Sequence, residues 1–197
     1  MLNLLCIRRI SIMSKKALLI IDYTNDFVHP KGTLSCGKPG QAIENKIISL
    51  ANTFLANDDY VILPTDCHQV NDPYHPESKL FPSHNIVNTW GRELYNRLAD
   101  WYQENHTRKN VYFFDKNRYS SFANTNLENY LRSRQIEELH LTGVCTDICV
   151  LHTAVDAYNK NFNLCIHSDA TASFDPAGHQ WALNHFKNCL GAKIEGI

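Results

Sequence analysis

The chain has 197 residues, about the size of a single globular domain, and 44% of them are hydrophobic, which is enough for a full core. Its net charge of −1, with no run of Lys or Arg, gives no indication of a nucleic-acid partner or an anionic membrane surface. Seven cysteines at irregular spacings do not match the even, regular set typical of a secreted disulfide-rich domain. They favour a reducing cytoplasm, where thiols serve as core residues, metal ligands or nucleophiles.

The first twelve residues, MLNLLCIRRISI, are apolar and then basic. A signal peptide has the reverse order, and a segment of this length is too short to span a bilayer. The pattern of a folded domain begins directly after Met13. We therefore predict a disordered or non-native extension at residues 1–12 and a single domain over residues 13–197.

Short apolar segments alternate with longer amphipathic ones along the rest of the chain. In chain order, strands are expected at residues 17–21, 60–64, 111–114, 138–142 and 164–167, with a weaker sixth at 192–195. Helices are expected between them at residues 41–56, 90–104, 127–134, 149–160 and 177–189. The third helix follows a capping-box sequence, in which Glu128 would reach back to the amide of Thr125. Repeated β-then-α units predict an α/β fold: a doubly wound, Rossmann-like sheet of about six mostly parallel strands with helices on both faces.

Polar residues follow four of the predicted strands. In a doubly wound sheet with strand order 3-2-1-4-5-6, ligands bind where the carboxyl ends of the strands meet. Asp22 follows the first strand, the loop 66–84 follows the second, Lys116 follows the third, and the segment 145–149 follows the fourth. All four polar segments are therefore expected at one edge of the sheet, where we predict a functional site.

Asp22, Lys116 and Cys149 form the first candidate group. Cys149 lies at the expected start of a helix, where the helix dipole and free amides favour a thiolate. A nearby carboxylate can take the thiol proton, and a nearby ammonium can hold both anions. The simpler alternative is a buried structural thiol beside a turn aspartate and a solvated lysine. Placement at three different strand ends favours a catalytic group.

The loop 64–85 is the second candidate group. It concentrates possible metal ligands, namely Asp66, Cys67, His68, Asp72, His75, Glu77 and His84. His, Asp and Glu together suit a divalent ion such as zinc, iron or manganese. The alternative is a polar loop whose histidines only cap turns and form hydrogen bonds. Cys67 is expected to be a bystander, because its side chain alternates away from those of its neighbours.

The segment GVCTDICV contains Cys145 and Cys149, four residues apart. A metal pair, a disulfide and a redox couple are all compatible with this spacing, as is a turn that aims backbone amides at a developing oxyanion. Three aromatic residues, Phe27, Phe81 and Tyr119, lie beside the polar groups in the sequence. They are either ordinary core residues or the lining of a cleft that suits a flat heteroaromatic ring.

At these positions the sequence resembles the isochorismatase-like cysteine hydrolases, and within them the bacterial nicotinamidase/pyrazinamidase family. The matching segments are LLIIDYTNDFV, TDCHQVNDPYHPESKLFPSHN, FDKNRYSSF and LTGVCTDICVLHTAVDAY. The resemblance implies a catalytic triad of Asp22, Lys116 and Cys149, and an oxyanion hole formed by the amides of Cys145 and Cys149 after a cis peptide between Val144 and Cys145. It further implies a metal site at Asp66, His68, Glu77 and His84, and ring contacts from Phe27, Phe81 and Tyr119.

The implied activity is hydrolysis of nicotinamide to nicotinate and ammonia through a cysteine thioester, in NAD salvage, with pyrazinamide as a further substrate. One divalent metal ion per subunit, zinc first, and a homo-oligomer such as a dimer are also implied. Many family members use a second histidine in the metal loop, so His75 or Glu77 completes the set; the segment HPESKLFPSHN favours Glu77. Cys145 stands where a small or aliphatic residue is usual. The alternatives are a sister amidohydrolase of carbamoyl or ureido substrates and a non-catalytic metal or redox sensor.

Overall fold

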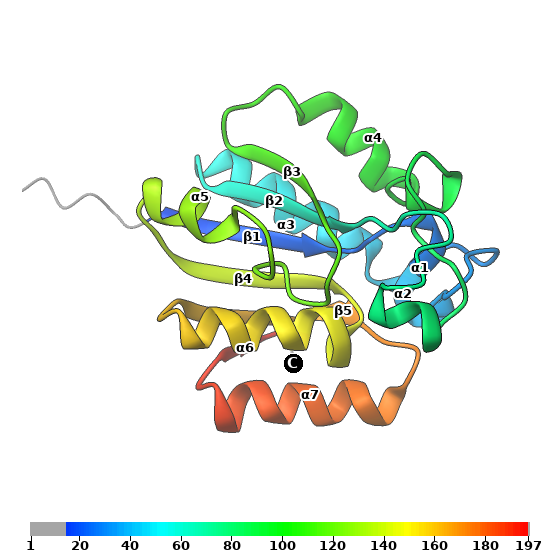
Figure 1. Cartoon of the computed structure of the whole chain (residues 1–197). Coiled ribbons are helices and arrows are strands. Elements are labelled where there is room, and N and C mark those ends of the chain that lie inside the picture. The colour runs from blue at the N-terminus through cyan, green and yellow to red at the C-terminus, as the bar shows by residue number, and fades with distance from the viewer. Residues whose placement is uncertain (1–14, 197) are drawn as a thin grey trace, which may run out of the picture.

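The computed structural model describes residues 15–196, so the extension predicted at residues 1–12 lies outside the described part of the chain. Within this part, six parallel strands form one sheet in the order β3-β2-β1-β4-β5-β6 (Figure 1). The strands are β1 (Lys15–Ile21), β2 (Tyr60–Asp66), β3 (Val111–Lys116), β4 (Ile136–Val144), β5 (Asn163–Ala172) and β6 (Lys193–Glu195). The predicted α/β class and strand order are confirmed.

Helices cover both faces of this sheet. They are α1 (Asn25–Val28), α2 (Gly37–Ala42), α3 (Glu44–Ala56), α4 (Asn96–Asn105), α5 (Leu127–Ser133), α6 (Leu151–Asn159) and α7 (Pro176–Cys189). Side chains of β1 alternate between two cores: Leu18 and Ile20 pack with α3 and α4, whereas Leu19 and Ile21 pack with α5, α6 and α7. Figure 1 shows α6 and α7 together on one side of the sheet. None of the helices in residues 15–196 has the length and apolar character needed to cross a bilayer.

Two of the predicted helices have different bounds in the structure. The helix expected at 41–56 is divided into α2 and α3, and the one expected at 90–104 begins only with α4. The segment before α4 is held by other contacts. The amide of Asn25 donates to the carbonyl of Glu93 at 2.9 Å, and Thr24 forms an antiparallel bridge with Leu94. These bonds require an extended chain there, which a helix cannot supply.

The predicted capping box before α5 is wrong. The helix begins at Leu127 with Asn126 as its N-cap. The Glu128 carboxylate lies 2.6 Å from the ammonium of Lys160, which follows α6. The Thr125 hydroxyl instead donates to the carbonyl of Ser121 at 2.6 Å. Glu128 therefore pairs with Lys160, a residue distant in the sequence, and does not form the expected bond to the Thr125 amide.

Candidate active site

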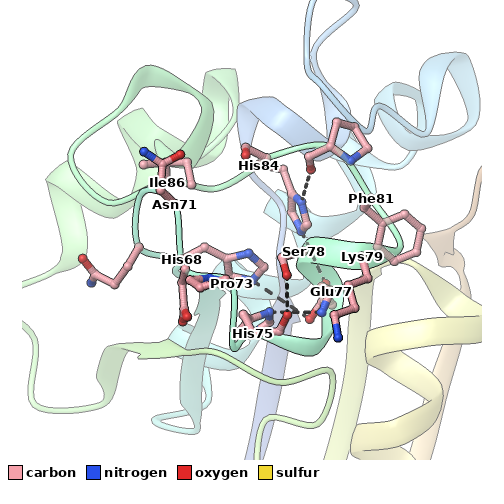
Figure 2. Close-up of a pocket in the computed structure, with 14 residues that line it drawn as sticks. His68, Asn71, Pro73, His75, Glu77, Ser78, Lys79, Phe81, His84 and Ile86 are labelled. Atoms are coloured by element: carbon pink, nitrogen blue, oxygen red, sulfur yellow. Dashed lines mark hydrogen bonds and ion pairs between the residues drawn. The ribbon is translucent and has the colours of Figure 1, made fainter.

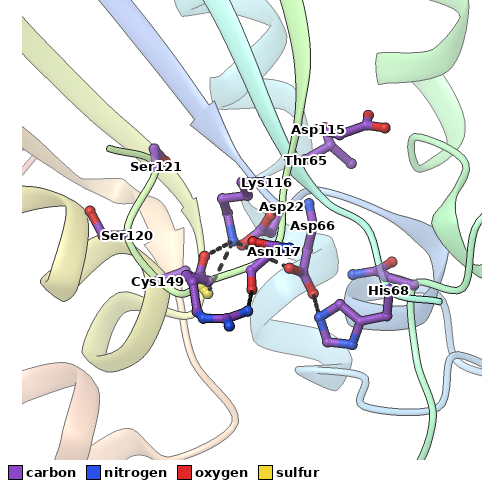
Figure 3. A network of polar contacts seen from close by, with 12 residues as sticks. Asp22, Thr65, Asp66, His68, Asp115, Lys116, Asn117, Ser120, Ser121 and Cys149 are labelled. Atoms are coloured by element: carbon purple, nitrogen blue, oxygen red, sulfur yellow. Dashed lines mark hydrogen bonds and ion pairs between the residues drawn. The ribbon is translucent and has the colours of Figure 1, made fainter. Parts of the chain in front are cut away.

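Three buried side chains meet at the carboxyl edge of the sheet (Figure 3). Asp22 directly follows β1, Lys116 is the last residue of β3, and Cys149 lies in a π-helical turn, Thr146–Val150, between β4 and α6. The Lys116 ammonium lies 2.7 Å from Asp22 Oδ2 and 3.8 Å from Cys149 Sγ. All three side chains are buried. The structure thus brings together the residues that were predicted as a triad.

Burial determines the charge of the acid and the thiol. It is the largest effect on Asp22 and raises the pKa of this carboxyl to about 6, against the opposing effect of the Lys116 ammonium. Burial also raises the pKa of the Cys149 thiol well above its usual range, and Lys116 offsets this only in part. At pH 7 the site therefore pairs an ionised carboxylate with a neutral thiol. The position of Cys149 near a helix start predicted a thiolate, and the structure differs because the sulfur is enclosed.

Lys116 remains charged although it is enclosed. Burial is the largest effect and opposes the charge, but Asp22, Cys149 and Asp66 together raise the pKa of the ammonium. The ammonium also donates to the carbonyl of Arg118 at 3.1 Å. A buried cation in this position can stabilise negative charge that develops on the Cys149 sulfur.

The segment leading to Cys149 requires a close approach of two strands. Gly143, near the end of β4, has a φ of 104°, and a Cβ there would lie 2.0 Å from the carbonyl oxygen of Ile21. The Val144–Cys145 peptide is cis, as the family resemblance implied. The amides of Cys145 and Cys149, which the resemblance assigns to an oxyanion hole, belong to the turn that follows.

The Cys145 side chain contacts a third cysteine. Its sulfur lies 3.3 Å from that of Cys36, the residue before α2, and all three cysteines are free thiols. The structure therefore joins Cys145 to Cys36 and not to Cys149. Sequence reasoning missed Cys36, because the two contacting cysteines are 109 positions apart and share no motif.

The predicted metal ligands form one buried cluster beside the triad. The ligand atoms of Asp66, His68, Glu77 and His84 all lie within 4.8 Å of one another. Asp66 ends β2, and its Oδ2 lies 2.8 Å from His68 Nε2 and 3.6 Å from His84 Nε2. Glu77 approaches from a short 3-10 turn, with Oε2 3.5 Å from His84 Nε2. Figure 2 shows His68, Glu77 and His84 lining the same pocket.

The free nitrogens of this cluster fit a metal ion. His84 Nδ1 donates to the carbonyl of Pro82 at 2.9 Å, which leaves the lone pair on Nε2. His84 Nε2 is buried and makes no hydrogen bond within residues 15–196, and buried His68 Nε2 faces only the Asp66 carboxylate at 2.8 Å and the Glu77 carboxylate at 4.0 Å. A buried nitrogen without a hydrogen bond is costly unless something else satisfies it. Two imidazoles and two carboxylates are a donor set that a divalent transition metal accepts.

His75 lies beside the cluster and is engaged elsewhere. Its Nε2 donates to the carbonyl of Asn117 at 2.7 Å, and its Nδ1 accepts from the amide of Glu77 at 3.3 Å. Its ring lies 4.3 Å from the ring of His68. With both nitrogens occupied, His75 positions the loop, and Glu77 supplies the fourth candidate ligand.

Asp66 connects the metal cluster to the triad. Its amide donates to Asp22 Oδ1 at 2.8 Å, and its own Oδ1 lies 3.7 Å from the Lys116 ammonium. Burial opposes its charge most strongly, but Lys116, His68 and His84 together lower the pKa of this carboxyl to about 2. The two groups predicted separately therefore form a single charged network.

An apolar cavity lies between Cys149 and the candidate metal cluster. Its walls include the three predicted aromatic residues, Phe27, Phe81 and Tyr119, together with Glu77, His84, Cys145 and Cys149. Sequence reasoning missed three further lining residues, Leu34, Ile148 and Phe174. Phe174 follows β5 and could have been found, because the carboxyl end of that strand lies at the same edge.

This fold and site place the chain in a known family. Residues 16–195 match the family model of the isochorismatase domain, so the chain belongs to the isochorismatase family. The isochorismatase family protein PncA of Bacillus subtilis is 57% identical over 180 residues, which cover 91% of this chain and 98% of that protein.

Two solved structures indicate the kind of enzyme that this chain resembles. The crystal structure of nicotinamidase/pyrazinamidase PncA from Bacillus subtilis matches with a TM-score of 0.91 at 56% identity, covering 92% of this chain and 100% of that one. The structure of pyrazinamidase of Pyrococcus horikoshii in complex with zinc matches with a TM-score of 0.80 at 25% identity, covering 93% and 99%.

Proposed function

We propose that this protein is a nicotinamidase, which hydrolyses nicotinamide to nicotinate and ammonia in the cytoplasm as part of NAD salvage, and which also deamidates pyrazinamide. The observation that carries this proposal is a single apolar cavity with Cys149 on one side and His84 and Glu77 on the other. The apolar walls of this cavity suit a planar aromatic amide, whose amide group would lie at the sulfur and whose ring nitrogen would face the metal cluster. The similarity to nicotinamidase/pyrazinamidase PncA supports the same substrate.

Catalysis begins with proton transfer inside the triad. Asp22, ionised at pH 7, takes the proton of the Cys149 thiol as the sulfur attacks the amide carbonyl carbon. Lys116, 3.8 Å from the sulfur, stabilises the charge that develops there. The backbone amides of Cys145 and Cys149 hold the oxyanion.

The same carboxyl group completes the reaction. Protonated Asp22 gives its proton to the departing nitrogen, so the C–N bond breaks, ammonia leaves and a thioester to Cys149 forms. Asp22 then takes a proton from water, whose oxygen attacks the thioester carbonyl. The C–S bond breaks, the proton held by Asp22 returns to the sulfur, and the product leaves as nicotinate after losing its carboxyl proton to solvent. Every other proton is moved by one carboxyl group, whose pKa of about 6 suits both directions.

Asp66, His68, Glu77 and His84 would hold the divalent metal ion, and when bound it would supply a Lewis acid that anchors the ring nitrogen. We propose zinc, with iron and manganese as alternatives, because the donors are imidazoles and carboxylates. The zinc complex of the Pyrococcus horikoshii pyrazinamidase supports this choice.

A comparison of three substrates tests the proposal. The purified, reduced and metal-replete protein is given nicotinamide, pyrazinamide or a carbamoyl amino acid, and ammonia is measured. We expect rapid release from the two aromatic amides and little from the carbamoyl compound. Ammonia release from the carbamoyl compound alone would mean that the protein is a sister amidohydrolase of carbamoyl substrates. Release from none of the three compounds would favour a non-catalytic metal or redox sensor. A homo-oligomer such as a dimer is expected for the active form.

A further inference from the structure

A second group of potential metal ligands lies within the sheet, away from the active-site edge. It comprises His140 on β4, Cys165 and His167 on β5, and Glu195 on β6. The strand register places His140 beside Cys165 and His167 beside Glu195. The ring of Phe54 on α3 packs edge-on against His140 at 5.0 Å, so the group lies on the face that α3 covers. The proposed amidase chemistry uses none of these residues.

We propose that His140, Cys165, His167 and Glu195 form a second metal site, which takes a zinc-class divalent ion and serves the structure of the sheet edge. One ligand atom from each residue lies within 4.8 Å of the other three, the same limit that the Asp66 cluster satisfies. His140, Cys165 and His167 are buried, whereas about a third of the Glu195 side chain is exposed, at 37%. The exposed carboxylate gives an ion a path from solvent.

The two imidazoles already face each other. His140 Nδ1 lies 2.8 Å from His167 Nε2, so one of these two atoms donates and the other accepts. His140 Nε2 lies 2.8 Å from Glu138 Oε1, which also pairs with the ammonium of Lys16 at 2.9 Å. A carboxylate acceptor fixes the proton of His140 on Nε2 and leaves the lone pair on Nδ1.

This arrangement is typical of a histidine that binds a metal. Ligating histidines commonly donate their second ring nitrogen to a carboxylate, as His140 does to Glu138. With the His140 proton on Nε2, His167 Nε2 donates to His140 Nδ1. Transfer of that proton to His167 Nδ1, which lies 3.6 Å from Glu195 Oε2, would leave lone pairs on both facing nitrogens. Coordination would deprotonate the Cys165 thiol, and its proton would leave to solvent.

The chemistry of the donors selects the ion. Two imidazole nitrogens and a thiolate suit zinc or cobalt, whereas magnesium and calcium require mostly oxygen ligands. The fourth donor, Glu195, lies on a strand of only three residues at the edge of the sheet. A bound ion would join β4, β5 and β6 and hold this short strand in place. We therefore expect the site to stabilise the fold and to leave the amidase reaction unaffected.

Cobalt(II) provides a direct test, because a thiolate ligand gives an intense charge-transfer band and the Asp66 cluster contains no cysteine. The metal-free double variant His68→Ala/His84→Ala is titrated with cobalt, and bound metal is counted after gel filtration. We expect one equivalent to remain bound, with the thiolate band. Adding Cys165→Ser should remove both the band and the equivalent, whereas Cys189→Ser, at an exposed thiol on α7, should leave both unchanged.

Thermal unfolding gives a second readout that does not depend on the spectrum. Zinc should raise the melting temperature of the His68→Ala/His84→Ala variant, and the rise should be lost when His167→Gln is added. Circular dichroism of each variant establishes that it is folded. Absence of the cobalt band from the folded double variant, or its persistence after Cys165→Ser, would overturn the proposal. In that case the two histidines are only a hydrogen-bonded pair in the core.

Discussion

The two halves of the candidate active site are built in different ways. Asp22 and Lys116 lie directly at the ends of strands, and the sheet itself positions them. The candidate metal cluster draws three of its four potential ligands from the irregular loop that follows β2, and polar contacts position them. These include the bond from His75 to the Asn117 carbonyl and the bond from the Asn85 amide to Asp26 Oδ2 at 2.7 Å. The sheet therefore positions Asp22 and Lys116, whereas the position of the metal cluster depends on individual hydrogen bonds in the loop.

The largest expected effect is loss of the nucleophile. Cys149→Ala should lower ammonia release by at least about 10⁴-fold, because no other group can form the thioester. The metal content and the melting temperature should stay close to those of the parent protein. The matched control is Cys189→Ala, which removes an exposed thiol and should retain full activity. Activity of Cys149→Ala near the parent level would contradict the assignment of the nucleophile.

Removing the Lys116 ammonium should lower the stability of the protein, because this buried cation balances two buried carboxylates. Lys116→Met leaves Asp22 and Asp66 enclosed without their counter-ion, so the free energy of unfolding should fall by about 3–5 kcal/mol. Urea denaturation followed by circular dichroism measures this change. The control is Lys16→Met, which breaks a half-exposed pair with Glu138 and should cost much less. Equal losses for the two variants would show that the network is not a buried one.

A substitution in the loop that follows β2 should lower the affinity for metal without changing the reactivity of the Cys149 thiol. His75→Ala removes the bond to the Asn117 carbonyl, so the affinity for zinc should fall by about 10- to 100-fold. The rate at which a thiol reagent modifies Cys149 should stay the same. Tyr74→Ala, at an exposed neighbour in the same loop, is the control and should change neither property. Equal loss of metal in both variants would argue against a positioning role for His75.

The pH dependence reports on the carboxyl group at the end of β1. Because burial raises the pKa of Asp22 to about 6, the ionised base is lost as the pH falls below that value. We expect kcat/KM to fall by about tenfold for each pH unit below 6, measured with metal present throughout. If kcat/KM instead begins to fall only near pH 4, the ordinary pKa of an aspartate, Asp22 is not the base.

The smallest effect is expected at the cavity mouth. Phe174 is half-exposed and lines the cavity, so Phe174→Ala should raise KM several-fold, equivalent to about 1 kcal/mol, and leave kcat unchanged. Trp181→Ala, at an exposed aromatic residue of α7 outside the cavity, is the control. A fall in kcat without a change in KM would mean that Phe174 affects the chemical step and not substrate binding.

The sequence predicted best what depends on periodicity. Alternating apolar and amphipathic segments predicted the doubly wound class, whose strand order the structure has. The strand ends then predicted that Asp22 and Lys116 meet, and they lie 2.7 Å apart. The loop was harder, because residues two apart in an irregular segment have no fixed direction. Only the family resemblance favoured Glu77 over His75 as a ligand, and the bond from His75 to the Asn117 carbonyl is consistent with that preference.

Two contacts between distant segments were missed in the sequence. The contact between Cys36 and Cys145 joins residues on different elements, and neither position indicates its partner. The second histidine pair, His140 and His167, was also missed. Polar residues inside two apolar strands were the available signal, because such residues need partners when they are buried.

Metal removal tests whether the strand-end triad and the metal held by the loop act on one substrate. Ammonia release from nicotinamide is measured for the reduced protein before chelation, after chelation and after zinc is returned. We predict that activity is lost on chelation and restored by zinc, with a folded protein throughout. Full activity in the chelated protein, with metal analysis confirming removal of the ion from the Asp66 cluster, would show that the metal has no part in the reaction.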